Sequence, residues 1–175
     1  MDRYPDDIPL RSCYGTVLVR QEEYEHAAHI FESLRECPEL PPEYDAVILN
    51  NLAWIDVASW KVKDFQRAQD FSHRAMDALP WNSAVKGTRG SVLVASGDVA
   101  IGINLLKEAW VENEDIQNQA LNAAFLALGY ARLKELQDAR HWFNTAQRLD
   151  PHCSQLKRVR QEIDDLAAAA ASPSP

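Results

Sequence analysis

Apolar residues recur along this chain at the spacing of helices that each bury one face. The clearest case lies near the C-terminus, where Leu156, Val159, Ile163 and Leu166 fall on one side of a helix and charged residues on the other. Alternating β-branched runs, which strands would show, are scarce. The pattern predicts an all-α chain with helices at residues 10–20, 24–36, 43–61, 65–78, 83–96, 99–111, 115–133, 136–149 and 152–170. Pro151 is expected to start the last of them, because proline fits the first turn of a helix.

A five-residue pattern recurs four times, at residues 23–27, 64–68, 98–102 and 135–139. Each copy begins with an acidic residue and ends on a small one. Asp64 and Asp98 are suited to cap helices that begin directly after them. The recurrence predicts four units, each made of a helix, a turn and a second helix.

Small and aromatic residues stand at matching places in the four units. They are Gly15, Ala27 and Phe31; Ala53, Phe65, Ala68 and Pro80; Gly90, Gly102 and Leu106; and Ala127, Tyr130, Ala139, Phe143 and Pro151. These units resemble tetratricopeptide repeats, a family in which small residues let helices approach closely and aromatic residues fill the space beside them. The resemblance covers residues 10–151. It implies a TPR-type α-solenoid of four helix-turn-helix repeats, with an N-terminal arm (1–9), a C-terminal capping helix (152–170) and a tail (171–175).

The repeat register makes specific predictions about burial. Eight small residues are expected where helices cross: Gly15, Ala27, Ala53, Ala68, Gly90, Gly102, Ala127 and Ala139. The third unit departs from the family, because Lys86 and Arg89 stand where a Trp and a Leu usually pack. We expect Arg89 to reach a nearby carboxylate or the carbonyl groups at a helix end; the candidates are Glu108, Glu112, Glu114 and Asp115. In the alternative, this helix is rotated and both cations lie in solvent.

Composition narrows the function classes. The 175 residues fit one domain, and the net charge of −8 disfavours nucleic-acid binding, which requires a basic surface. No apolar run is long enough to span a bilayer, and the acidic start lacks the order of a signal peptide. Cys13, Cys37 and Cys153 are widely spaced and odd in number, which is typical of free thiols in a reducing compartment. We therefore expect a cytoplasmic protein without a membrane span.

No pattern indicates catalysis or a bound cofactor. His26 and His29 are three positions apart without a third ligand, which favours exposed helix-surface histidines over a metal site. The stretch from Gly87 to Gly90 lacks the lysine and the preceding strand of a phosphate-binding loop. No nucleophile elbow is present. The expectation is a protein that is not an enzyme and holds no cofactor and no metal.

The resemblance also implies a binding face, because in this family the first helix of each repeat lines the concave side. The residues expected there are Ser12, Thr16 and Val19; Asn50, Trp54 and Val57; Gly87, Ser91 and Val94; and Ala124, Leu128 and Ala131. The clamp of Lys, Asn and Arg that holds acidic chaperone tails is incomplete. The predicted peptide-binding residues are Asn50, Trp54, Gly87, Ser91 and Leu128, with Trp54 as the aromatic anchor.

Several functions remain open at this point. The leading hypothesis is a protein–protein interaction scaffold that holds a partner peptide or helix in its concave groove. The alternatives are a structural module that self-associates into a homo-oligomer, and a regulatory repeat segment of a larger protein, membrane proteins included. A further alternative is that Trp54 packs within its own repeat and the terminal segments fill the groove.

Overall fold

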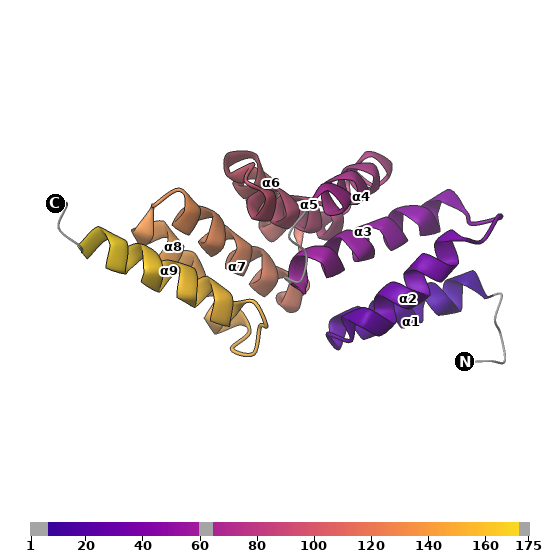
Figure 1. Cartoon of the computed structure of the whole chain (residues 1–175), viewed down its shortest axis with the longest axis horizontal. Coiled ribbons are helices and arrows are strands. Elements are labelled where there is room, and N and C mark those ends of the chain that lie inside the picture. The colour runs from indigo at the N-terminus through magenta and orange to yellow at the C-terminus, as the bar shows by residue number, and fades with distance from the viewer. Residues whose placement is uncertain (1–6, 60–64, 172–175) are drawn as a thin grey trace. The chain divides into compact units, whose positions relative to one another are not determined.

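The computed structural model describes residues 7–59 and 65–171, and over these ranges it contains nine α-helices and no strand. The all-α prediction is therefore confirmed for the described residues (Figure 1). The chain, whose length fits one domain, divides into two compact units, residues 1–80 and 81–175. Two helix pairs fall in each unit, and the ninth helix belongs to the second.

The first unit contains four helices that pack in chain order. These are α1 (Ile8–Arg20), α2 (Tyr24–Arg35), α3 (Pro42–Ala58) and α4 (Gln66–Ala78). Each packs on the next, and α1 also packs on α3 (Figure 1). The core of this unit includes Phe31 and Leu34 from α2 with Ile48 and Leu52 from α3, all without exposed surface.

Gly15 explains how α1 and α2 approach each other. A Cβ atom at this position would lie 2.7 Å from Cζ of Phe31, so only glycine leaves room for the ring. Burying a phenylalanine completely stabilises a fold by about 1.5–3 kcal/mol relative to leaving it exposed. Gly15 on α1 and Phe31 on α2 therefore stabilise the contact between these two helices together.

The second unit is organised around one central helix. It contains α5 (Ser83–Ser96), α6 (Val99–Glu112), α7 (Ile116–Arg132), α8 (Leu136–Leu149) and α9 (Leu156–Ala171). The other four helices all pack against α7, which buries its side chains on most of its circumference. Arg132, at the end of α7, also donates to the carbonyl oxygens of Val94 and Ala95 and so satisfies the C-terminal end of α5.

The burial predictions are confirmed for all eight small residues, since each is buried in the structure. The close approach is most direct between α5 and α6. A Cβ atom on Gly102 would lie 2.8 Å from the carbonyl oxygen of Gly90, and a Cβ atom on Gly90 would lie 3.0 Å from the carbonyl oxygen of Gly102. These two glycines bring the two backbones into contact.

Two expectations about helix ends were wrong. The last helix begins at Leu156 rather than after Pro151, because residues 151–155 form turns in which Asp150 accepts from the backbone N–H of His152 at 2.9 Å. Asp98 stands at the start of α6, yet its side chain makes no capping hydrogen bond. Asp64 and the end of the helix predicted at 43–61 lie outside the described residues.

The turns inside three helix pairs share one backbone feature. A residue with positive φ follows the first helix in each: Glu22 (φ 62°), Gly97 (φ 113°) and Lys134 (φ 64°). Only one of the three is the glycine that this conformation favours. Along the described ranges, no helix is long and apolar enough to cross a membrane.

Candidate functional site

Helix α3 presents a half-buried surface that includes Asn50 and Trp54 of the predicted binding face. Tyr44, Val47, Asn50 and Trp54 lie on one side of α3 and are half-buried. The opposite side belongs to the core, where side chains such as Leu49 and Ala53 are almost completely buried. We call these four half-buried residues the α3 face. It combines two aromatic rings, one aliphatic side chain and one amide.

Asn50 gives the α3 face an unsatisfied polar group. Its side-chain oxygen is buried and accepts no hydrogen bond from any described residue. The neighbouring Asn51 differs, because its amide nitrogen donates to the carbonyl oxygen of Val47 at 2.8 Å. A buried acceptor without a donor costs about 1–3 kcal/mol. A partner's donor would recover that energy once the Asn50 side chain turns outward to meet it, and the backbone N–H of an extended peptide is such a donor.

The other predicted contact residues do not provide an exposed surface. Gly87 is buried, Ser91 is 1% exposed and Leu128 has no exposed surface at all. Most of the remaining residues expected on the same side are buried as well, namely Ser12, Val57, Val94, Ala124 and Ala131, whereas Thr16 and Val19 on α1 are half-buried. Ser91 and Leu128 therefore cannot touch a partner in this structure, and we correct their assignment.

Close packing of helices in the second unit explains why Gly87, Ser91 and Leu128 are buried. At Gly87, a Cβ atom would lie 2.5 Å from the side-chain oxygen of Asn122 on α7, so α5 and α7 leave no space there. Leu128 lies on α7, the helix on which four others pack. We expected the small residues to leave space for a side chain of a partner. In the structure they let helices of the same unit pack closely against each other.

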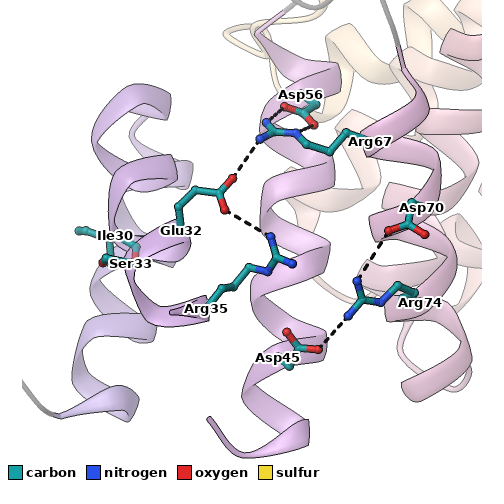
Figure 2. Close-up of polar contacts among 9 residues, drawn as sticks. All are labelled: Ile30, Glu32, Ser33, Arg35, Asp45, Asp56, Arg67, Asp70 and Arg74. Atoms are coloured by element: carbon teal, nitrogen blue, oxygen red, sulfur yellow. Dashed lines mark hydrogen bonds and ion pairs between the residues drawn. The ribbon is translucent and has the colours of Figure 1, made fainter. Parts of the chain in front are cut away.

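A cluster of charged residues that was not predicted from the sequence joins α2, α3 and α4 (Figure 2). The guanidinium of Arg67 donates to both carboxylate oxygens of Asp56, with 2.8 Å from Nε to Oδ2. Its Nη1 donates to Glu32 at 2.9 Å, and Glu32 also pairs with Arg35 at 3.3 Å. The guanidinium groups of Arg35 and Arg67 both lie near the ring of Phe71, at 4.6 and 5.7 Å from its centroid.

The electrostatics of this cluster favour a structural role. Asp56 is almost completely buried, and the hydrogen bond it accepts raises the pKa of Arg67 above its usual value, against the lowering effect of burial. Arginine is therefore charged throughout the working pH range, and it offers no proton for general acid or base chemistry. A neighbouring set, in which Arg74 lies 3.4 Å from Asp45 and 3.7 Å from Asp70, has the same character (Figure 2).

Replacing Asp56 with alanine should destabilise the first unit. The change leaves the Arg67 guanidinium with Glu32 alone, and we expect a loss of about 1–3 kcal/mol in the free energy of unfolding. The loss stays below that of a fully buried pair because Arg67 is half-exposed. Urea denaturation followed by circular dichroism measures it. Asp70→Ala is the matched control: it removes an exposed ion pair and should cost less than about 0.5 kcal/mol. Equal effects of the two changes would contradict the role given to Asp56.

Nothing in the sequence identified the Arg67 cluster. Asp56 and Glu32 lie 11 and 35 positions from Arg67, so no helical spacing relates either of them to it, and only Glu32 and Arg35 are three apart on one helix. In the second unit, two of the carboxylates named as candidates for Arg89 pair with Lys86. Its Nζ lies 2.6 Å from Glu112 and 3.9 Å from Glu108.

The histidines singled out in the sequence lie on the surface of α2. His26 and His29 are exposed, and His26 lies 2.9 Å from the carboxylate of Glu23. Across the part of the chain that the structure describes, no group of three or more His, Cys, Asp or Glu side chains is placed to hold a metal ion.

Comparisons with known proteins give no relative for this chain: no family model, no curated protein and no solved structure matches it.

Proposed function

We propose that this chain is a protein-interaction module, built as a tetratricopeptide-like α-solenoid, whose α3 face binds a partner peptide. The single observation that carries the proposal is the unsatisfied oxygen of Asn50 beside the half-buried ring of Trp54, one turn further along the same helix. An extended peptide could place a backbone N–H on Asn50 and an apolar side chain against Trp54. Interface energy concentrates on such aromatic residues.

The packing within each unit supports the repeat architecture. The first helix of a pair packs on the second, and it also packs on the first helix of the next pair, as α1 does on α3 and α5 on α7. Small residues stand at the crossings in the register that the repeat pattern predicts. This packing of helices is the basis of the tetratricopeptide-like architecture proposed here.

Free thiols at all three cysteines are typical of a protein in a reducing compartment. Cys13, Cys37 and Cys153 form no disulfide with one another, as expected where disulfides are not maintained. We place the proposed interaction in the cytoplasm on that ground. We assign no catalytic role to the charged cluster, because its arginines hold its carboxylates in ion pairs.

Replacing Trp54 with alanine tests the proposal. Peptides selected from a random displayed library against the intact chain serve as probes, and calorimetry gives their dissociation constants. Loss of an aromatic anchor should weaken binding by at least about 2 kcal/mol, or roughly 30-fold. Trp81→Ala is the matched control, because this tryptophan is 74% exposed and lies outside the α3 face. Unchanged affinity in Trp54→Ala, with normal melting, would remove the α3 face as the binding site.

Asn50 allows a second comparison on the same peptides. Asn50→Ala removes the buried acceptor and should weaken binding while leaving stability unchanged or improved, since an unsatisfied group is lost. If Asn50→Ala and Trp54→Ala lower stability but not affinity, both residues serve packing alone.

A further inference from the structure

Helix α1 has an apolar face that nothing in the described structure covers. One side of α1, with Ser12, Gly15 and Leu18, is buried in the first unit. The other side presents Leu10, Tyr14 and Val17, which are 50, 41 and 43% exposed, together with the exposed thiol of Cys13. We call Leu10, Cys13, Tyr14 and Val17 the α1 stripe.

The α1 stripe has the spacing of a helix-pairing seam. Its residues fall at i, i+3, i+4 and i+7, the positions at which one helix meets another of the same kind. Eight large apolar side chains are exposed among the described residues, and any one of them alone would be ordinary, but three of the eight lie on α1 within two turns. A continuous seam of this kind indicates a surface that packs on another helix.

The charges on α1 make the stripe complementary to itself. Asp7 stands at the N-terminal cap, where its side chain accepts the backbone N–H of Leu10 at 2.9 Å. Arg20 lies in the last turn. When two copies of α1 lie antiparallel, Leu10 of one copy faces Val17 of the other, and Asp7 faces Arg20. The acidic end of each helix thus meets the basic end of the other.

We propose that the α1 stripe is a homodimer interface, in which two copies of α1 pack antiparallel about a twofold axis between Cys13 and Tyr14. A second copy of this chain is favoured over a different protein, because two copies of α1 supply both apolar surfaces and, at Asp7 and Arg20, both opposite charges. Closed twofold pairing is also the commonest form of self-association. The interface is small compared with those of stable dimers, so the dimer forms weakly and rises with protein concentration. The proposal does not depend on peptide binding at the α3 face.

Sedimentation equilibrium over a wide range of concentrations tests whether the dimer exists. The wild-type chain should shift from monomer to dimer as concentration rises. Val17→Glu places a carboxylate in the seam twice per dimer and should raise the dissociation constant at least about tenfold. Val111→Glu is the matched control, because Val111 is 76% exposed on α6, outside the stripe, and this change should leave the dissociation constant unaltered. A chain that stays monomeric up to millimolar concentration overturns the proposal, even if the stripe binds another protein.

Cross-linking tests the register, and it also covers the case in which Val17→Glu fails to fold. All three cysteines are first replaced, by Ser at Cys13 and Cys37 and by Ala at the buried Cys153. Chains carrying Leu10→Cys are then mixed with larger, tagged chains carrying Val17→Cys, and a short bis-maleimide is added. The mixed product should exceed the Leu10→Cys self-product by at least about tenfold. Equal yields of mixed product and self-products would show random collision and overturn the antiparallel register.

Discussion

Replacing Phe31 with alanine should cost the first unit about 3–5 kcal/mol, because its ring is completely buried and fills the space above Gly15. Removing the ring leaves a cavity between α1 and α2 that neither helix can close without moving. Small proteins are stable by only about 5–15 kcal/mol, so this loss is a large fraction of the total. Urea denaturation followed by circular dichroism gives the change in the free energy of unfolding.

Two further variants show whether Phe31 and Gly15 act together. Phe31→Leu keeps most of the volume and should cost less than about 1.5 kcal/mol. Gly15→Ala in the wild-type chain places a methyl group 2.7 Å from the ring, whereas in the Phe31→Leu background the methyl group has room. The cost of Gly15→Ala should therefore fall in that background, which a double-mutant cycle measures. A loss below about 1 kcal/mol for Phe31→Ala would contradict the packing described for this pair.

Gly102→Ala should destabilise the second unit by about 1–3 kcal/mol, although alanine is the better helix former. Its Cβ atom would lie 2.8 Å from the carbonyl oxygen of Gly90 and 2.8 Å from the backbone nitrogen of Val94. Both obstacles are backbone atoms, so the strain is relieved only if α5 and α6 move apart. The free energy of unfolding from urea denaturation measures the effect.

Gly87→Ala is the control for Gly102→Ala. Its Cβ atom also meets an oxygen, at 2.5 Å, but that oxygen belongs to the side chain of Asn122, which can rotate. Both changes gain the same helix propensity, so the difference between them isolates the backbone clash. Gly102→Ala should be the more destabilising of the two. Equal stabilities would mean that α5 and α6 separate at little cost, against the close contact seen at Gly90.

The charged residues show which contacts could be predicted from the sequence and which could not. Lys86 and Arg89 were noticed because they interrupt an apolar pattern, and Lys86 does meet carboxylates of the next helix. Asp56 and Arg67 interrupt no pattern, yet they form the most buried ion pair described here. A sequence reveals a charge that interrupts an apolar period, but it does not reveal that the fold brings two charges on neighbouring helices together.

The sequence by itself determined the helices and their crossings. Nine helices with most of their ends, and eight buried small residues, follow from apolar spacing and from the recurrence of Gly and Ala. These features are local, because a helix repeats every 3.6 residues and the residues of one short segment determine which face it buries. Turn geometry already goes beyond this, since Glu22 and Lys134 adopt positive φ without the glycine that would signal it.

Only the tertiary structure decided which faces stay exposed. Ser91 and Leu128 have the spacing of a lining row, but the packing of four helices on α7 buries that row. Leu10, Tyr14 and Val17 have the spacing of a core stripe, but α1 packs on its neighbours through its other side, and the stripe faces outward. Apolar spacing on one helix says that a face is suited to burial. Whether another helix of the same chain covers that face depends on distant segments, and so no local pattern contains the answer.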